Sequence, residues 1–354
     1  MATALLASNQ SAVFVKTQSN LNQFDNPTAG SAPFTNAIRV IGTPSFTPRG
    51  AGIIDRKEVF TPWGGNSSSR TGGLGWDITF QTEFFWQFGQ AYDLDLSNQT
   101  QLAALWLSSP WAITHPLLAT GLAVQPFFEP LTSRAVTNYA VQPFSIVYEE
   151  TGGKRYEAFD CVALPKISWE YGQRVMIDWT IKGSWRPVTN SQEIQPTYRS
   201  NTTEPPVIGV NCALTFTGLI CQTDAVSKVT IDTGWTLNDV GDTRQPYGFG
   251  ISFFRPDASP SLEIDMAEFE EGTGPSSYVQ PSFTDAESNI IGSSIVLVMT
   301  VSTGQTWTIT LDNPQYVAFP SIGETNGYRS TTLKWQCIPD SSASPLTFEM
   351  TTSN

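Results

Sequence analysis

Residues 155–187 read RYEAFDCVALPKISWEYGQRVMIDWTIKGSWRP and predict two β-strands joined by a turn. On the second strand, Val175, Ile177, Trp179 and Ile181 alternate with polar or less apolar neighbours. Alternation with a period of two is typical of a strand that has one buried and one solvated face. Gly172 supplies the turn, because glycine tolerates the positive φ that a tight turn requires.

A similar order of features returns at residues 307–339, WTITLDNPQYVAFPSIGETNGYRSTTLKWQCIP. Both stretches contain a proline-marked break, a glycine turn and then a strand with a tryptophan: Pro165, Gly172 and Trp179 in the first, and Pro320, Gly327 and Trp335 in the second. Ser261–Met266 likewise matches Trp76–Glu83 in position and alternation. The two similar stretches predict a duplicated domain.

The length of 354 residues also favours two domains over one. Frequent glycine and proline, spread along the chain, predict a mainly β fold with many turns. We predict an N-terminal arm at 1–36, a first domain at 37–187, a polar linker at 188–206 and a second domain at 207–354. Each domain is expected to have at most one short flanking helix, and in the first half residues 101–107 fit one.

Two polar segments interrupt this plan. After a possible strand at 11–16, residues 17–36 are too polar to build a core, so they form either a disordered tail or a segment ordered by a neighbouring subunit. Residues 61–75 form a Gly/Ser-rich loop long enough to be functional or mobile. We find neither a signal peptide at the start nor an apolar run long enough to cross a membrane.

The net charge of −13 is unevenly distributed. Residues 1–200 carry 14 Lys and Arg against 15 Asp and Glu, whereas residues 201–354 carry 5 against 17. A strong negative charge repels other anions, so the chain is a poor candidate for gripping nucleic acid. An ordinary acidic solvated surface would give the same count.

The sequence shows no enzyme signature. His115 is the only histidine and lacks triad partners, and the zinc ligand sets are missing. Asp93, Asp95 and Ser97 have alternating oxygen spacing but lack the glycine and closing glutamate of a calcium loop. The phosphate-binding glycine motifs are absent as well. We therefore expect no catalysis, no cofactor and no metal.

Two groups of residues leave alternatives open. Glu263, Asp265, Glu268, Glu270 and Glu271 could supply a glycosidase pair, with tryptophans stacking on sugar. The tryptophans at 76, 169, 179, 307 and 335 are instead mostly in register with apolar neighbours, which favours a core position. The four cysteines, at 161, 212, 221 and 337, fit reduced buried thiols, although a disulfide between 212 and 221 is possible.

Taken in order, the chain resembles the tail tube (major tail) proteins of long, non-contractile-tailed bacteriophages. The resemblance covers nearly the full chain and has no single diagnostic motif. The residues that carry it are Asp55-Arg56-Lys57 before the 64–75 loop, Trp76–Glu83, Gln101–Leu107, Ser145–Tyr148, Gly152–Tyr156, Cys161–Pro165, Trp179–Pro187, Val210–Gly218 and Val226–Asp232.

The resemblance implies two tandem tail-tube-like β-sandwich or barrel domains. In this family the inner sheets join between subunits into a barrel around a channel, and rings of six such domains stack into a tube. Three two-domain chains would then make one ring, although six remain possible. The implied partners are further copies of the chain, a tape measure protein, and tail terminator and baseplate proteins, while DNA passes without specific binding. The implied location is the virion tail, assembled in the bacterial cytoplasm.

Within this expectation, polar strand faces line the channel and the long loop bridges rings. The candidate lumen residues are Asp77, Glu83, Asp178, Lys182, Glu263 and Asp265, and the candidate inter-ring residues are Gly64, Gly65, Arg70 and Gly73. A carbohydrate-binding β-sandwich or another virion component, such as a baseplate or capsid decoration protein, is the competing interpretation. The acidic segment at 267–272 does not fit a helix, which departs from the first half.

Overall fold

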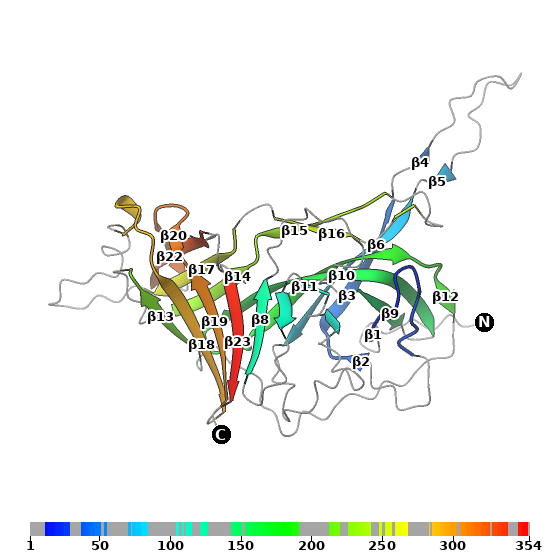
Figure 1. The fold of residues 1–354 in the computed structure, drawn as a ribbon, viewed down its shortest axis with the longest axis horizontal. Coiled ribbons are helices and arrows are strands. Elements are labelled where there is room, and N and C mark those ends of the chain that lie inside the picture. Colours follow the sequence, from blue (N-terminus) through cyan, green and yellow to red (C-terminus); the bar gives the residue numbers. More distant parts are fainter. Residues whose placement is uncertain are drawn as a thin grey trace, which may run out of the picture.

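A computed structural model describes residues 11–28, 37–50, 53–54, 70–71, 73–83, 104–105, 108–109, 111–114, 121–126, 143–150, 153–190, 212–219, 226–241, 248–249, 252–256, 259–267, 283, 285–302, 305–325, 328–338 and 346–352. These residues are almost entirely β-strand, so the predicted mainly β class is confirmed (Figure 1).

The strands of the first half are β1 (Ala12–Thr17), β2 (Ala37–Ile38), β3 (Ile41–Gly50), β4 (Ile53–Ile54), β5 (Arg70–Thr71), β6 (Leu74–Glu83), β7 (Trp111–Thr114), β8 (Gly121–Pro126), β9 (Phe144–Glu150), β10 (Lys154–Glu170), β11 (Met176–Trp185) and β12 (Thr189–Asn190). Those of the second half are β13 (Cys212–Thr217), β14 (Val226–Asp232), β15 (Trp235–Asn238), β16 (Phe253–Pro256), β17 (Ser261–Ala267), β18 (Ser294–Ser302), β19 (Gln305–Asp312), β20 (Pro314–Tyr316), β21 (Ser321–Thr325), β22 (Tyr328–Cys337) and β23 (Leu346–Thr352).

The large sheet contains the same four-stranded antiparallel arrangement twice. The first copy runs β3-β6-β11-β10, and the second runs β14-β17-β22-β21. Strand β10 of the first copy pairs with β14 of the second, so eight strands follow one another without a break. β17 occupies in the second copy the place of β6 in the first, as the match between their sequences predicted.

The hairpin at 155–187 forms as predicted, with a positive φ of 71° at Gly172. The predicted break at Pro165 is wrong, because β10 continues through it. Pairing of β10 with β9 ends at Cys161, and pairing with β14 begins at Lys166. Pro165 lies where one side of the strand has no partner among the described strands, so its missing N–H costs no ladder hydrogen bond.

In the second copy the counterpart of β10 is divided. β20 and β21 pair with successive parts of β22, and residues 317–320 lie between them. The break predicted at Pro320 is therefore present. Residues 307–311, at the start of the second similar stretch, lie in β19, which belongs to a different sheet.

At a β-bulge, β10 changes its pairing partner from β9 to β14. The register shifts around Asp160, whose φ is 50°, and β10 pairs with β9 before the shift and with β14 after it. Gly183 of β11 lies against this bulge. A Cβ atom there would come within 2.5 Å of Cys161 Sγ and 3.0 Å of Ala158 Cβ.

We expect Gly183→Ala to lower the free energy of unfolding by about 1–3 kcal/mol, because the added methyl group overpacks the bulge. Denaturant unfolding of the two proteins measures this difference. Gly241→Ala is the matched control, since a Cβ at Gly241 meets nothing within 4 Å. Equal losses in the two variants would contradict close packing at Gly183.

The largest hydrophobic cluster of the described residues spans both copies. The residues predicted to be buried on β6 and β11 are buried, and at the joint between the copies Ile167 lies opposite Ile231 and Trp169 opposite Val229. In the first half the sheet packs over β1 and β9. In the second it packs over a six-stranded sheet ordered β13-β18-β19-β23-β8-β7.

Strands β7 and β8 extend the second half although they come from the first, because β8 pairs with β23. Residues 112–114 and 121–126 therefore lie in strands that the sequence patterns did not predict. Of the predicted helix, Ala104 and Leu105 are helical and Ser108 follows them, with its N–H donating to Ala104 O. A helical segment at 283 and 285–287 has no counterpart in the prediction.

The predicted linker begins within the first copy, since residues 189–190 form β12, paired with β10. Residues 191–206 and the acidic segment at 268–272 lie outside the described residues. In the described part of the chain, no helix has the length and apolar character needed to cross a membrane.

Candidate functional site

One face of the eight-stranded sheet is mainly polar, and we call it the polar face. The pairing places Asp77 opposite Lys182, Gln81 opposite Asp178, and Glu263 opposite Lys334. Residues that are paired in this way point to the same face. The polar face therefore contains all six candidate lumen residues, Asp77, Glu83, Asp178, Lys182, Glu263 and Asp265. Five are at least partly exposed, whereas Glu83 is buried and forms an ion pair with Arg174.

The polar face carries seven carboxylates and five cationic groups: Asp77, Glu83, Glu170, Asp178, Asp232, Glu263 and Asp265, with Arg49, Lys166, Lys182, Lys228 and Lys334. Lys166, Lys228 and Lys334 pair with carboxylates of neighbouring strands, as in Lys334–Glu263 at 3.6 Å, and Lys182 pairs with Asp239 outside the sheet. Two carboxylates accept hydrogen bonds instead: Asp178 from Gln81 at 2.6 Å and Asp265 from Thr332 at 2.6 Å. The face is thus mildly acidic, and its cations are already engaged.

The joint between the copies combines backbone pairing with two ion pairs. Lys166 of β10 lies 3.3 Å from Asp232 of β14, and Lys228 of β14 lies 3.9 Å from Glu170 of β10. The N–H of Tyr171 donates to Ser227 O at 2.7 Å. All four charged groups are about half exposed, so each ion pair stabilises weakly and mainly fixes the register.

The connection between β14 and β17, residues 233–260, crosses from the second copy onto the polar face of the first. We call it the second arm, and residues 51–73 between β3 and β6 the first arm. Strands β15 and β16 form the base of the second arm. Leu237 packs on Val162 of β10, and both are almost fully buried, with Trp235 and Leu164 against them.

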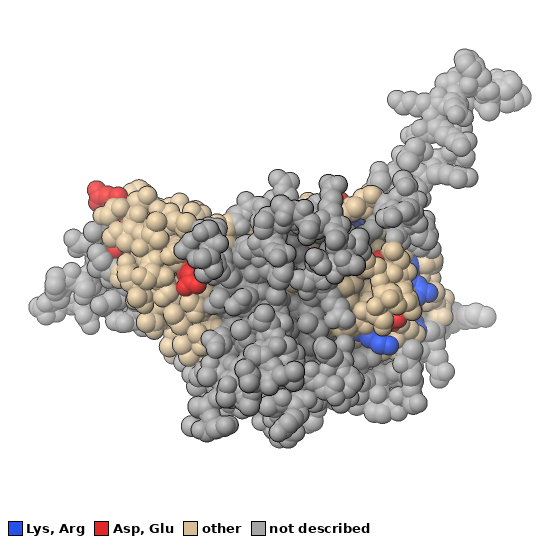
Figure 2. All heavy atoms as spheres, in the orientation of Figure 1, with Lys and Arg blue, Asp and Glu red and all other residues tan. Residues whose placement is uncertain are grey.

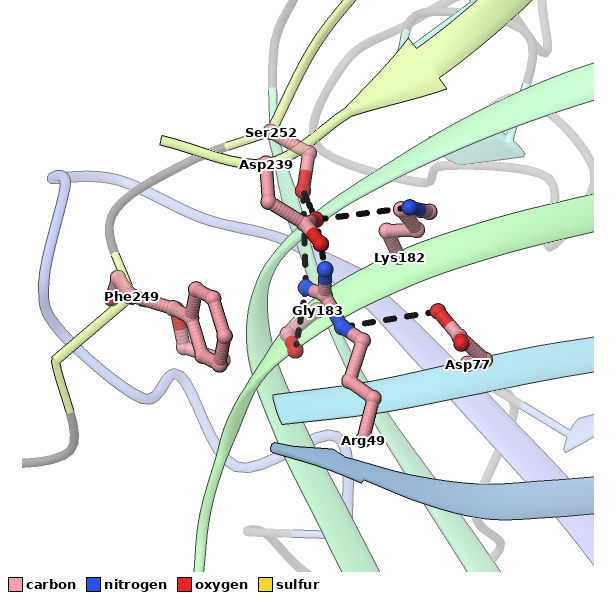
Figure 3. Close-up of polar contacts among 8 residues, drawn as sticks. Arg49, Asp77, Lys182, Gly183, Asp239, Phe249 and Ser252 are labelled. Carbon is pink, nitrogen blue, oxygen red and sulfur yellow. Dashed lines mark hydrogen bonds and ion pairs between the residues drawn. The ribbon is translucent and has the colours of Figure 1, made fainter. Parts of the chain in front are cut away.

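Asp239 of the second arm belongs to a partly buried charged cluster around Arg49 of β3 (Figure 3). The Arg49 guanidinium forms an ion pair with Asp239 of the arm, and its Nε lies 3.4 Å from Asp77 Oδ1. Its Nη2 donates to Gly183 O at 3.3 Å. Lys182 Nζ lies 3.5 Å from Asp239 Oδ1. We call Arg49, Asp77, Lys182 and Asp239 the Arg49 cluster.

Other residues complete this packing. Ser252 Oγ donates to Asp239 Oδ1 at 3.3 Å, and the ring of Phe249 lies 4.9 Å from the Arg49 guanidinium carbon. A Cβ at Gly75, the residue opposite Arg49, would come within 2.7 Å of Arg49 Nε, so glycine leaves room for the guanidinium. The cluster therefore depends on small residues as well as on charges.

Burial changes the electrostatics of the cluster. The Arg49 side chain is 9% exposed, and this desolvation lowers the pKa of its guanidinium, while Asp77 acts in the opposite direction. Desolvation also lowers the pKa of Lys182, and the nearby Arg49 charge lowers it further. The carboxylate of Asp77 acts against desolvation at both cations, because a nearby negative charge favours their protonated forms. Sequence reasoning missed Arg49, because only the folded arm brings it to Asp239.

Of the candidate inter-ring residues, Gly64 and Gly65 lie outside the described residues. Arg70 belongs to the short strand β5, and Gly73 lies at the end of the first arm. A Cβ at Gly248 of the second arm would come within 3.0 Å of Gly73 Cα. The second arm therefore reaches across the whole first copy, as far as the base of the first arm.

Residues 18–28 pack on their own chain, so both alternatives offered for this part of the N-terminal arm are wrong. Gln18 Nε2 and the N–H of Asn22 each donate to Asp160 Oδ1 at 3.0 Å. Arg155 donates to Thr28 Oγ1 at 2.8 Å, and the guanidinium of Arg186 lies 4.0 Å from the Phe24 ring centroid.

Ionisation of the Asp160 carboxyl group is expected to change the free energy of unfolding. Its burial raises its pKa above the ordinary 3.8, while the hydrogen bonds from Asn22 and Gln18 act against this. A carboxyl group whose pKa is raised in the folded state contributes its full stabilisation below pH 3.8, where it is protonated. This contribution is lost as the pH rises through the pKa of the folded state. We expect Asp160→Asn to gain stability relative to wild type as the pH rises above 3.8, since asparagine keeps the acceptor oxygen and suits positive φ.

Asp160→Ala removes the acceptor and places alanine at positive φ, and should cost about 2–4 kcal/mol at any of these pH values. Urea unfolding of the three proteins at each pH gives both results. A stability difference between Asp160→Asn and wild type that does not change with pH would contradict the titration.

Most of the remaining candidate residues are buried or lie outside the described part of the chain. The tryptophans at 76, 169, 179 and 335 are buried, as predicted, and the side chain of Trp307 lies outside the described set. Cys161 and Cys337 are buried and free, Cys212 is half-buried, and Cys221 is not described. Desolvation raises the pKa of the Cys212 thiol to about 12. His115, Asp93, Asp95 and Ser97 lie outside the described residues, within which no metal-binding group of three His, Cys, Asp or Glu occurs.

Figure 2 shows the charged side chains visible on one side of the molecule: Lys and Arg gather over the first half, and acidic groups appear over the second. This asymmetry agrees with the uneven charge of the sequence. Comparison of the sequence with protein-family models gives no match, and comparison with curated proteins gives none either.

Proposed function

We propose that the protein is a structural component of a phage tail that assembles into stacked rings around a channel. The observation that carries this proposal is the tandem sheet: two four-stranded copies joined edge to edge, with one polar face and a free edge at each end. β3 and β21 are these edges, each with a single partner strand in the described structure. An open sheet with exposed edges must be covered or paired.

The strand pairing between the two copies of one chain would be repeated between neighbouring chains. β10 and β14 show how one copy pairs with the next, and β21 and β3 occupy the corresponding places at the two ends of the sheet. Pairing β21 of one chain with β3 of another repeats this geometry, which is a head-to-tail contact that closes into a ring. Three chains supply six copies, and the polar face then lines the channel.

A further feature of the polar face supports this function. The cations of the polar face are engaged by carboxylates, and free cations are what bind phosphates. Such a wall suits the passage of DNA without retention. Tape measure, terminator and baseplate proteins would be the partners at the ends of the tube.

Negative-stain electron microscopy of the purified protein at increasing concentration tests the proposal. We expect hollow tubes or stacked rings, and the number of lobes together with the 38.7 kDa chain mass distinguishes three chains from six. A protein that stays monomeric at every concentration would overturn the proposal. A sugar-binding screen would then be the next measurement.

A further inference from the structure

The two copies carry different charges at three equivalent positions of the polar face. Strand pairing sets the equivalence, because β3, β6 and β11 of the first copy correspond to β14, β17 and β22 of the second. The positions hold Arg49, Asp77 and Lys182 in the first copy, and Asp232, Glu263 and Lys334 in the second. The formal charge of the three residues is +1 in the first copy and −1 in the second. The first copy therefore has a positive surplus that these three strands do not balance.

Asp239 of the second arm supplies the balancing negative charge. Its Oδ1 forms an ion pair with the Arg49 guanidinium and lies 3.5 Å from Lys182 Nζ. The hydroxyl of Ser252, from the same arm, donates to this oxygen at 3.3 Å. Three donors from β3, β11 and the second arm thus converge on one carboxylate oxygen, as Figure 3 shows.

Packing holds the donors in place. The side chain of Arg49 is 9% exposed and Ser252 is 2% exposed. Arg49 Nη2 also donates to Gly183 O at 3.3 Å, which fixes the guanidinium on the side away from Asp77. Donors that are held by other contacts lose little freedom when an acceptor binds. The side chains of Asp239 and Lys182 are 30% and 22% exposed, so solvent reaches the point of convergence.

The converging groups are those that bind phosphate. A guanidinium offers a fork of N–H donors that matches phosphate oxygens, and an ammonium adds a compact charge. The other lysines of the polar face pair with carboxylates of adjacent strands, whose positions the register fixes. Arg49 and Lys182 share a carboxylate from a connecting segment, so this acceptor can be removed without disturbing the large sheet.

We propose that Arg49, Lys182 and Ser252 form a phosphate-binding site, and that the Asp239 carboxylate occupies it as an intramolecular substitute for the phosphate. With Asp239 in place, the charge of the Arg49 cluster is zero; without it, the charge is +1. In the proposed tube this site faces the channel, where Asp239 keeps the wall from holding the phosphates of passing DNA. That role rests on the proposed function, whereas phosphate binding by the site does not.

Removal of the carboxylate tests the site on the single chain. We expect Asp239→Ala to bind inorganic phosphate roughly tenfold more tightly than wild type in ³¹P NMR titrations at constant ionic strength, because the ligand regains the lost contacts. Amide hydrogen exchange at residues 235–239 should be faster than in wild type, and should slow again when phosphate replaces chloride, since Ser252 connects the ligand to the arm. A residue with only a structural role would give no response to phosphate.

Two further variants separate this site from any freed cation. Asp232→Ala frees Lys166, which is half exposed on the same face, and should bind phosphate no more tightly than wild type. Lys182→Met in the Asp239→Ala background should return binding to the wild-type level. Equal binding by Asp239→Ala and Asp232→Ala would overturn the site, and so would binding that persists without Lys182. Circular dichroism checks that each variant is folded.

A DNA oligonucleotide tests the role of the site in the tube. Tubes of Asp239→Ala should retain a fluorescent single-stranded oligonucleotide that wild-type tubes release, and the retained amount should fall as salt rises. Phosphate binding without retention of DNA would overturn the role in the channel and leave the site itself standing. Failure of the wild-type protein to form tubes would overturn the proposed function, whereas the titrations on the single chain decide the site in either case.

Discussion

Ile322→Lys should abolish ring and tube formation while leaving the monomer folded. Ile322 lies on β21, a free edge of the tandem sheet, and is 50% exposed. A lysine on an edge strand opposes pairing with another strand, because its charge must be desolvated. The change should alter the free energy of unfolding by no more than about 0.5 kcal/mol, since the side chain has few buried neighbours to lose.

Size-exclusion chromatography with light scattering gives the particle mass, and electron microscopy shows whether rings and tubes form. Wild type should form large particles, and Ile322→Lys should elute at the mass of one chain. Val188→Lys is the control for an added charge at a similarly exposed valine. Tubes formed normally by Ile322→Lys would show that β21 is not a joint between chains.

Mixtures of Ile322→Lys with wild type also count the chains in a ring. The variant keeps its β3 edge, so it can join a wild-type chain but prevents closure, because every joint in a head-to-tail ring must form. The yield of closed rings should fall with the third power of the wild-type fraction for three chains and with the sixth power for six. At equal amounts these are about one eighth and one sixty-fourth. A yield that falls only in proportion to the wild-type fraction would contradict closure through this edge.

Local sequence patterns predicted much of the sheet. Alternation identified β6, β11 and β17, because each has one buried and one solvated face and the period of two is visible in the residues themselves. The same alternation placed Asp77, Asp178, Lys182, Glu263 and Asp265 on polar sides of their strands. It could not place these strands in one sheet, which depends on the pairing of β10 with β14.

The features that the sequence did not predict depend on long-range contacts. Pro165 looks like a strand break, yet it is tolerated because one side of β10 has no partner at that residue. Strand β8 pairs with β23, more than two hundred residues away in sequence. Asp239 reaches Arg49 only because the second arm crosses the first copy. No local pattern encodes such neighbours.

The Arg49 cluster should be the most sensitive polar site for stability. Arg49→Met is expected to lower the free energy of unfolding by about 3 kcal/mol, because it leaves Asp239 and Asp77 without their shared cation in a partly buried place. It should also release the second arm from the first copy, with faster amide hydrogen exchange at residues 235–239. Lys166→Met removes an ion pair whose two side chains are 49% and 41% exposed, and should cost less than about 1 kcal/mol.

A double-mutant cycle separates the ion pair from the packing around it. If Arg49 and Asp239 stabilise the arm through each other, Asp239→Asn should cost much less in the Arg49→Met background than in wild type, with a coupling of about 1–3 kcal/mol. The variants Lys166→Met and Asp232→Asn give the matched cycle at the exposed pair, where the coupling should be below about 1 kcal/mol. Equal couplings in the two cycles would mean that the arm is held by Leu237 and Trp235 on β10, and that burial adds nothing to the charges at its tip.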